Sequence, residues 1–322
     1  TNAMSPREFS ATIEAFEGGG AVRMLPWVDA NLGEVKALLA AQGAVLLRNF
    51  ADSDNDDLAE AVLGRIGNEL LDDAYWSTPR KGVKGKTFTA TEMVPNRTIA
   101  LHSEMAYMPA WPRLVAFHAL IVAETGGETT VCDIDAASAL MGDVAAKFAG
   151  QDIIYQRSFH KGIDIPWQTA FRTEDRADVD EVAARNGMTV RWLDNGVLQT
   201  EHRAQGTVAD EAGRPLWFNQ AHVFHASSLG PARAQLEKLV GADKLPRNAI
   251  FADRSPIPDA DMAKVQDAFN TTTCAMAWQP GDVLVLDNMR FAHGRAPFTG
   301  ARKLHVAMAD AQTVRTRTPL FG

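Results

Sequence analysis

The chain has 322 residues, of which 46% are hydrophobic and 22% charged, and its formal net charge is −8. This balance is typical of a soluble globular protein, and the length suits one large domain or two average ones. The excess of acidic residues argues against a nucleic-acid partner, which needs a surface rich in Lys and Arg. No apolar run reaches the roughly 18 residues of a membrane-spanning helix, so we expect no membrane partner.

The first residues, T-N-A-M-S-P-R-E-F-S, lack a basic stretch followed by an apolar core. We therefore expect no secretory signal and a cytoplasmic location. The two cysteines, Cys132 and Cys274, do not form a C-x-x-C pair. They are typical of buried small side chains in a reducing compartment, and they indicate neither a disulfide framework nor a cysteine zinc site.

The first part of the chain predicts helix, strand and helix. Apolar residues at helical spacing predict a helix over 31–42, which Gly43 is placed to end. The run A-V-L-L (44–47) predicts a buried strand. A second helix is predicted over 56–66, closed by Gly67.

The middle of the chain is richer in β-forming residues. The runs 113–123 and 129–134 are expected to form a hairpin, because the E-T-G-G-E between them is typical of a turn. Asp135 is placed to cap a helix over 136–148. A second hairpin is predicted from T-V-R-W (189–192) and G-V-L-Q-T-E (196–201).

The polar region around 157–187 predicts a lid-like insertion, with weak helical signals at 166–171 and 179–186. Beyond it, the expected helices cover 232–240 and 259–269, and the expected strands cover 274–278, 282–287 and 303–309. No clean linker divides the chain, so we expect a single domain over 4–322. Its class is mainly β with inserted helices, with a β core closed into a sandwich or barrel and flanked by helices.

A possible metal site begins with the segment L-H-S-E-M-A-Y (101–107), where His102 and Glu104 are two positions apart. Residues so spaced on a strand point to the same face. One more imidazole would complete a 2-His-1-carboxylate set, which suits non-heme iron. The pair alone is weak evidence, because H-x-E also occurs by chance as ordinary surface polarity.

The third ligand is sought among the remaining histidines, with His305 set aside as part of a core strand. The candidates are His118, His160, His202, His222, His225 and His293. His118 lies in an apolar strand and is expected to be a core residue. His293 stands out, because it follows a buried strand that ends in D-N and precedes Arg302 by nine residues.

Three segments, in this order, resemble the taurine dioxygenase (TauD/TfdA) family of Fe(II)- and 2-oxoglutarate-dependent oxygenases. They are L-H-S-E-M-A-Y-M-P-A-W-P-R-L-V-A-F-H, G-G-E-T-T-V-C-D and W-Q-P-G-D-V-L-V-L-D-N-M-R-F-A-H-G-R-A-P-F-T-G-A-R-K. The first is similar to the branch that includes clavaminate synthase and the amino-acid hydroxylases of nonribosomal peptide pathways. The resemblance implies a double-stranded β-helix (jelly-roll) core flanked by helices.

The resemblance also implies roles for particular residues. His102, Glu104 and His293 would bind Fe(II), leaving room for 2-oxoglutarate and O₂. Arg302 would pair with the distal carboxylate of 2-oxoglutarate, since a guanidinium matches a carboxylate with two parallel hydrogen bonds. Thr129 would donate its hydroxyl to the same carboxylate.

Two departures from the family pattern matter. Most of the family has H-x-D, whereas this chain has the H-x-E of the clavaminate-like branch. The family's halogenases have Gly or Ala instead of the carboxylate, so Glu104 argues against halogenation. In some relatives the arginine lies nearer the position of Val306. Arg302 is therefore the first choice and Arg295 the second, although Arg295 has the alternative of pairing with a structural acid such as Asp287.

The segment W-F-N-Q-A-H faces the active site in relatives. Asn219, Gln220 and His222 are therefore candidates for substrate contact, with hydrogen bonding inside the core as the alternative. Tyr107 is a further candidate at the mouth of the pocket, or else an ordinary packed aromatic residue.

The resemblance implies a small-molecule substrate, namely an amino acid or an amino-acid unit tethered to a carrier protein. Hydroxylation of an unactivated C–H bond would release succinate and CO₂. Desaturation or ring closure by the same oxidant stays open, and so do a catalytically silent member that binds a small acid and a cupin-like zinc or manganese protein. The oligomeric state stays open as well.

Overall fold

The computed structural model describes residues 15–52, 54–55, 57–72, 82–84, 86–90 and 93–314. Two sheets form its centre, one of seven strands in the order β1-β2-β16-β6-β19-β4-β3 and one of four in the order β15-β8-β17-β5. The larger sheet consists of β1 (Ala15–Glu17), β2 (Ala44–Arg48), β3 (Gly82–Lys84), β4 (Thr87–Thr89), β6 (Ala110–Ile121), β16 (Val283–Asp287) and β19 (Lys303–Thr313). The smaller consists of β5 (Ile99–His102), β8 (Thr129–Asp133), β15 (Cys274–Met276) and β17 (Phe291–Arg295).

The two central sheets share one hydrophobic core. Phe117 of β6 and Leu284 of β16 belong to the same buried cluster as Val131 of β8 and Phe291 of β17. Along the chain, β5, β6 and β8 alternate between the two sheets, and so do β15, β16, β17 and β19. The architecture is therefore a mixture of packed sheets with helices around them.

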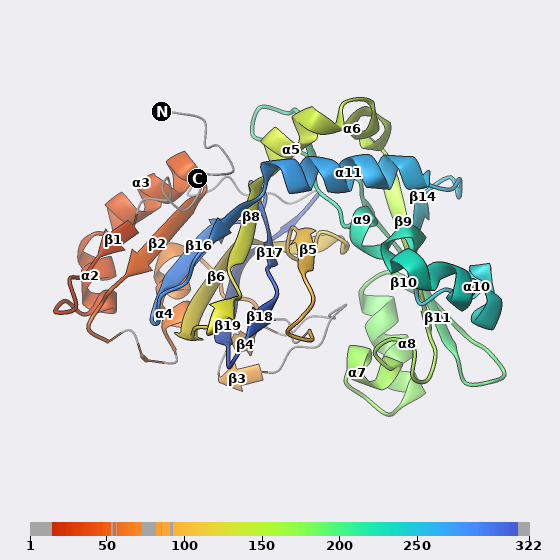
Figure 1. Cartoon of the computed structure of the whole chain (residues 1–322), viewed down its shortest axis with the longest axis horizontal. Coiled ribbons are helices and arrows are strands. Elements are labelled where there is room, and N and C mark those ends of the chain that lie inside the picture. Colours follow the sequence, from red (N-terminus) through yellow and green to blue (C-terminus); the bar gives the residue numbers. More distant parts are fainter. Residues whose placement is uncertain are drawn as a thin grey trace.

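The outer face of the larger sheet is covered by α2 (Met24–Ala30), α3 (Leu32–Gln42) and α4 (Leu58–Ile66), on the left of Figure 1. These helices and the outer face of the sheet form a second hydrophobic core. Val283 and Val285 of β16 belong to this second core, whereas Leu284 and Leu286 belong to the core between the two sheets. A strand buried on both faces explains the uninterrupted apolar run V-L-V-L.

The predicted elements of the N-terminal part are confirmed. The helix expected over 31–42 is α3, and Gly43 ends it in a left-handed conformation with φ of 76°. The helix expected over 56–66 is α4, although residue 56 lies outside the described residues. Gly67 ends it in an extended conformation.

The hairpin predicted from 113–123 and 129–134 is wrong. These segments form β6 and β8, which lie in different sheets: β6 pairs with β16 and β19, and β8 pairs with β15 and β17. The turn between them forms β7 (Thr125–Gly126), which pairs with β18 (Phe298–Thr299). The connection therefore crosses from one sheet to the other, because each strand finds its partners far away in the sequence.

The helix predicted over 136–148 is divided. It forms α5 (Ile134–Met141) and α6 (Asp143–Phe148), separated by Gly142 with φ of 54°. The cap is Asp133 and not Asp135, because the Asp133 carboxylate accepts a hydrogen bond from the Ala136 N–H at 3.1 Å.

A long inserted region follows β8 and returns to the smaller sheet at β15, and most of it lies on the right of Figure 1. It contains a four-stranded sheet in the order β10-β11-β9-β14. The strands of this sheet are β9 (Asp152–Phe159), β10 (Met188–Trp192), β11 (Leu198–Gln205) and β14 (Arg247–Phe251). The inserted region also contains the separate pair β12 (Thr207–Ala209) and β13 (Pro215–Trp217). Its other helices are α7 (Trp167–Phe171), α8 (Arg176–Arg185), α9 (Ala221–Phe224), α10 (Arg233–Val240), α11 (Asp259–Thr272) and two 3₁₀ helices, η2 (Ala226–Ala232) and η3 (Ala242–Lys244).

Sequence patterns inside the inserted region predicted several of these elements. The hairpin expected from 189–192 and 196–201 is confirmed as the antiparallel pair β10 and β11. The weak helical signals at 166–171 and 179–186 correspond to α7 and α8. The strands β9 and β14 were not predicted.

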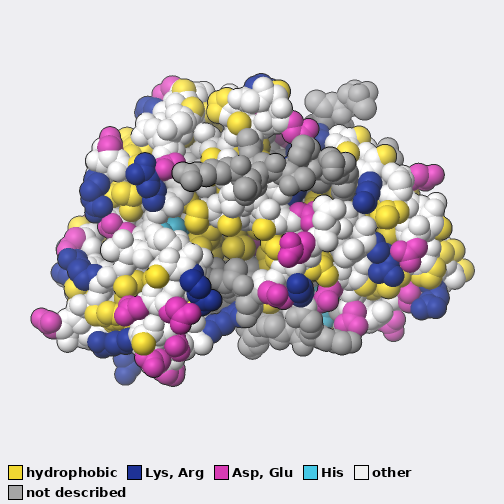
Figure 2. All heavy atoms as spheres, turned by 180° about the vertical axis from the view of Figure 1, so that it is seen from behind, with side chains coloured by type: hydrophobic (Ala, Val, Ile, Leu, Met, Phe, Trp, Pro, Cys, Tyr) yellow, Lys and Arg dark blue, Asp and Glu magenta, His cyan; other side chains and the backbone are white. Residues whose placement is uncertain are grey.

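The molecular surface carries charges of both signs. On the face shown in Figure 2, Lys and Arg side chains are interspersed with Asp and Glu. Within the part of the chain that the structure describes, no helix is long and apolar enough to cross a membrane. Cys132 and Cys274 are buried and form no disulfide, as predicted, and burial raises the pKa of the Cys132 thiol to about 12.

A buried ion pair joins the larger sheet to the turn before β16. Arg48 donates to both carboxylate oxygens of Asp282, at 2.9 and 2.6 Å, and the Asp282 side chain is fully buried. Asp282→Ala is expected to lower the free energy of unfolding by about 3 kcal/mol, because the guanidinium loses its partner in a largely dry site. Urea unfolding measures this value. Arg203→Gln, which breaks the exposed pair with Asp152, is expected to cost under about 1 kcal/mol.

Two buried histidines make the stability depend on pH. Burial lowers the pKa of His202 and of His222 to about 4. In the unfolded chain these histidines have a pKa of about 6.5. As the pH falls below that value, they bind protons in the unfolded chain but stay neutral in the folded one. Stability is therefore expected to be complete above pH 6.5 and to fall between about pH 6.5 and 4, by about 3 kcal/mol per histidine.

Denaturant unfolding at several pH values checks this dependence. The double variant His202→Gln/His222→Gln is expected to show a flatter profile across the same range. An unchanged profile in the double variant would show that other groups cause the loss.

Candidate metal centre

Three predicted ligands converge between two neighbouring strands. His102 ends β5 and lies opposite His293 of β17 in the antiparallel register, with their ring centroids 4.6 Å apart. The His293 Nε2 is 3.4 Å from the Glu104 Oε2. One ligand atom from each of the three residues lies within 4.8 Å of the others. Bonds of about 2.0–2.2 Å to one ion, at right angles to each other, place ligand atoms about 3 Å apart, so these side chains would move closer together around a bound cation.

Glu104 reaches the site in a way that the strand pattern did not predict. His102 is the last residue of β5, and Glu104 lies in the turn that follows it. Met105 adopts a left-handed conformation with φ of 55°, which is uncommon for a residue with a side chain. The turn, and not the alternation of a strand, therefore directs the carboxylate toward the two imidazoles.

The ring of His102 is oriented by the backbone of its own strand. Its Nδ1 lies 2.7 Å from the carbonyl oxygen of Ala100. A carbonyl only accepts, so Nδ1 carries the proton and Nε2 keeps its lone pair for a metal.

Asn288 supports Glu104 from behind. Its Oδ1 accepts from the Glu104 N–H at 2.6 Å, and its Nδ2 donates to the carbonyls of Glu104 and Pro112 at 2.9 and 2.8 Å. Asp287 and Asn288 stand at the end of a buried strand in the sequence, but no sequence pattern predicted a role for Asn288. Its neighbour Asp287 pairs with Arg113, at 2.8 Å between Nε and Oδ1, and not with Arg295 as considered from the sequence.

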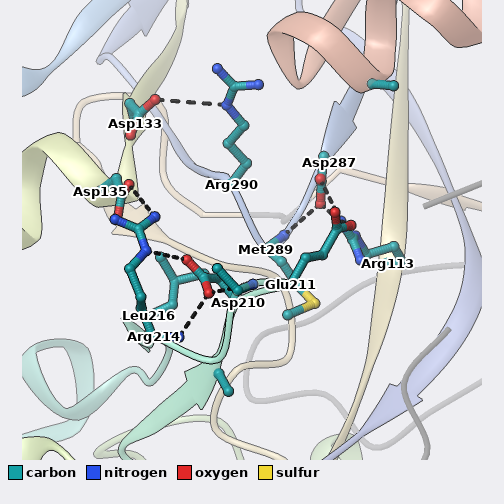
Figure 3. Close-up of a pocket in the computed structure, with 13 residues that line it drawn as sticks. Arg113, Asp133, Asp135, Asp210, Glu211, Arg214, Leu216, Asp287, Met289 and Arg290 are labelled. Atoms are coloured by element: carbon teal, nitrogen blue, oxygen red, sulfur yellow. Dashed lines mark hydrogen bonds and ion pairs between the residues drawn. The ribbon is translucent and has the colours of Figure 1, made fainter. Parts of the chain in front are cut away.

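A separate cavity of about 650 Å³ borders this support, and Figure 3 shows its charged lining. Arg113 and Asp287 form an ion pair on one side of it, and Arg214 lies between Asp135 and Asp210, 3.3 and 2.7 Å from their carboxylates. Among the described residues that line it, none is a candidate metal ligand. The Arg113–Asp287 pair lines this cavity, and Asp287 is next in the chain to Asn288, which binds the backbone of Glu104.

A small cavity of about 30 Å³ contains the other predicted site residues. Its lining includes His102, His293, Thr129, Arg295 and Arg302, together with apolar side chains such as Phe117. The structure thus brings together predicted site residues from three separate parts of the chain, around positions 102, 129 and 293–302. Val306, the position where some relatives have their arginine, also lines this cavity.

Arg302 is the cation that is open to a ligand in this cavity. Its Nε donates to the Gly127 carbonyl at 3.1 Å, and among the described residues no carboxylate pairs with it. Burial, and to a smaller extent the charge of Arg295, lowers the pKa of Arg302 to about 10. The guanidinium still carries its charge at neutral pH, in surroundings that favour an incoming anion.

Arg295 is held by the backbone instead. Its terminal nitrogens donate to the carbonyls of Met93, Val94 and Arg97 at 3.3, 3.0 and 2.8 Å. Burial lowers its pKa as well. Arg295 therefore adds positive charge to the cavity while most of its donors are already used.

Thr129 is prepared to donate. The indole N–H of Trp278 donates to the Thr129 hydroxyl oxygen at 2.9 Å. A hydroxyl that accepts this bond keeps its own hydrogen for another acceptor. Trp278 begins the W-Q-P-G turn, and no sequence pattern predicted that it belongs to the site.

The four predicted substrate contacts lie outside the described lining of the small cavity. Asn219, Gln220 and His222 are buried, and each donates to a backbone carbonyl, at 2.7, 2.8 and 2.6 Å. The ring of Tyr107 lies 5.3 Å from that of Phe224, between centroids. These contacts match the alternative of hydrogen bonding and packing in the core, and substrate contact stays a prediction.

Comparison with known proteins places this geometry in a family. Residues 12–308 match the model of the family described as taurine catabolism dioxygenase TauD, TfdA family. The dapdiamide synthesis protein DdaC of Enterobacter agglomerans is 34% identical over 291 residues, which are 88% of each chain. A clavaminate synthase-like protein of Arabidopsis thaliana is 29% identical over 283 residues, covering 83% of this chain and 82% of that protein.

A solved structure shows the same fold at low sequence identity. It is an asparagine oxygenase in complex with Fe(II), 3-hydroxyasparagine and succinate, with a TM-score of 0.52 and 15% identity. The match covers 87% of this chain and 79% of that chain. From the extent of the family match and of its relatives, the chain belongs to the TauD/TfdA family and is an Fe(II)- and 2-oxoglutarate-dependent dioxygenase.

Proposed function

We propose that His102, Glu104 and His293 hold the Fe(II) of this dioxygenase, and that the enzyme hydroxylates an unactivated C–H bond of an amino acid. The observation that carries the proposal is the convergence of two imidazoles and one carboxylate beside a cavity with a half-buried guanidinium, that of Arg302. A metal site and an anion site are the two parts that a 2-oxo acid needs.

The donor set fits Fe(II). Two neutral imidazoles and one carboxylate form the facial set found in non-heme iron oxygenases, which leaves positions open on one side. When bound, Fe(II) with 2-oxoglutarate and O₂ supplies the oxidant for C–H hydroxylation, with succinate and CO₂ as co-products. Glu104 occupies the ligand position that a halide needs, which favours oxygenation over halogenation.

Arg302 and Thr129 bind the distal carboxylate of 2-oxoglutarate. Arg302 offers the terminal nitrogens of its guanidinium, and Thr129 the hydrogen that Trp278 leaves unused. The hydrogen bond that the Arg302 Nε donates to the Gly127 carbonyl fixes the plane of the guanidinium, so little freedom is lost when a carboxylate binds. The apolar walls exclude water and strengthen both interactions.

The substrate is an amino acid or an aminoacyl unit on a carrier protein. Support comes from the relative DdaC, whose name places it in dapdiamide synthesis, and from the asparagine oxygenase that shares the fold. Desaturation or ring closure would use the same oxidant. Asn219, Gln220, His222 and Tyr107 stay candidates for the substrate side of the site.

The domain organisation follows the same proposal. The two sheets form a double-stranded β-helix, a view supported by the alternation of strands between them. The chain forms a single domain over 4–322, although residues 4–14 and 315–322 lie outside the described part. One buried cluster that joins Phe117 of the core to Phe159 and Val179 of the insertion supports this. The region 157–187 acts as a lid.

Removal of one ligand tests the metal site. His102→Ala or His293→Ala is expected to abolish the visible band that forms when 2-oxoglutarate is added anaerobically to the ferrous enzyme. Succinate formation is expected to fall at least about a hundredfold, because an incomplete ligand set loses the iron. His160→Ala, outside the site, is the control for folding and metal loading. Turnover retained in both alanine variants would refute the ligand assignment.

The anion site is tested through the Michaelis constant for 2-oxoglutarate. Arg302→Leu is expected to raise it about a hundredfold, since a bidentate charged hydrogen bond contributes about 3 kcal/mol. Arg302→Lys keeps the charge without the fork, so an intermediate value is expected. If Arg302→Leu leaves the constant unchanged while Arg295→Lys raises it, Arg295 binds the carboxylate.

Mass spectrometry of the product tests the reaction type. Free amino acids and aminoacyl carrier proteins are incubated with Fe(II), 2-oxoglutarate and air. Hydroxylation predicts a product heavier by one oxygen atom, together with succinate. A product lighter by two hydrogen atoms indicates desaturation or ring closure, and no succinate with any substrate favours a silent small-acid binder.

A further inference from the structure

The segment 101–108 carries two of the proposed ligands, His102 and Glu104. The strand ends at His102, so Glu104 lies outside the sheet. β5 ends at His102 and β6 begins at Ala110, so the residues between them have no strand partners. Residues 103–108 are nevertheless buried. Buried carbonyls need hydrogen-bond donors, and here no strand supplies them.

Side chains of α9 and the residue before it supply two of the donors. The His222 Nε2 lies 2.6 Å from the Leu101 carbonyl, and the Gln220 amide donates to the Ser103 carbonyl at 2.8 Å. Leu101 and Ser103 flank His102 directly. The Leu101 carbonyl belongs to the peptide that precedes His102, and the Ser103 carbonyl to the peptide that precedes Glu104. The two bonds therefore fix the peptide plane before each of these two ligands.

Side chains of β11 supply the others. The Gln205 amide donates to the carbonyls of Ala106 and Met108 at 2.9 and 3.2 Å. The His202 Nε2 lies 2.6 Å from the Tyr107 carbonyl. These bonds hold the turn that follows Glu104, whereas Asn288 holds the backbone of Glu104 itself.

We infer that His202, Gln205, Gln220 and His222 are positioning residues for the metal ligands. Four side chains of the inserted region converge on one short segment. His222 binds the Leu101 carbonyl near the end of β5, and the other three bind carbonyls beyond that end. A metal site needs its ligands placed within about 0.5 Å, so the frame that places them determines metal affinity. The inserted region, besides covering the core, thereby sets the geometry of the metal centre.

The inference rests on the proposed metal site, and the experiment separates the two. The full-length protein is freed of metal with a chelator and titrated with Co(II), whose visible absorption reports binding without turnover. Thermal unfolding of the metal-free protein is measured in parallel. Wild type must bind Co(II), and His293→Ala must lose it; otherwise the proposed metal site fails before positioning is tested.

The matched pair of variants is His222→Phe and His225→Phe. His225 is also a buried imidazole beside α9, but its Nε2 lies 2.9 Å from the Ile257 carbonyl, outside the ligand segment. Both variants are expected to lower the melting temperature of the metal-free protein to a similar extent. Only His222→Phe is expected to weaken Co(II) binding, by about tenfold or more.

Two further variants keep the result interpretable. His222→Gln retains a donor and is expected to recover part of the Co(II) affinity. Gln220→Met preserves the volume but removes the donor, so it repeats the test where His222→Phe does not fold. Wild-type Co(II) affinity in both His222→Phe and Gln220→Met, or an equal loss in His225→Phe, would overturn the inference.

Discussion

A buried carboxylate beside one buried and one half-buried imidazole is the constraint on which the rest of the structure depends. Removing Glu104 from water is costly, and its position in a turn provides no sheet to hold it. Hydrogen bonds from the surrounding structure hold this turn instead. Asn288 bonds to the N–H and the carbonyl of Glu104, and side chains of the inserted region donate to the carbonyls around it. The backbone that carries the proposed ligands is therefore held in place before a cation binds.

The sequence marked the proposed ligands more clearly than the side chains that hold them. His102, Glu104 and His293 stood out because two imidazoles and a carboxylate suit a transition metal, and because the segments around them resemble the motifs of the family. The donors to segment 101–108 left no such signal, since what they recognise is a backbone carbonyl, which every residue has. Gln205 and His202 thus read as ordinary strand residues until the fold brings them to the turn.

The same difference between local and distant information explains the fold prediction. The helix α3 and the hairpin of β10 and β11 follow from periodicity and turn residues, because their partners are close in sequence. The expected pairing of β6 with β8 failed because strand propensity does not specify a partner. β6 pairs with β16 and β19, both more than a hundred residues away in the chain.

The half-buried guanidinium of Arg302 has a consequence for the end of the catalytic cycle. Succinate keeps the distal carboxylate of 2-oxoglutarate, so in the proposed arrangement the same fork and the same Thr129 hydroxyl grip the product. The cavity does not distinguish the two acids at that end. Exchange of product for fresh co-substrate therefore depends on the end of the molecule that faces the metal, where the two acids differ.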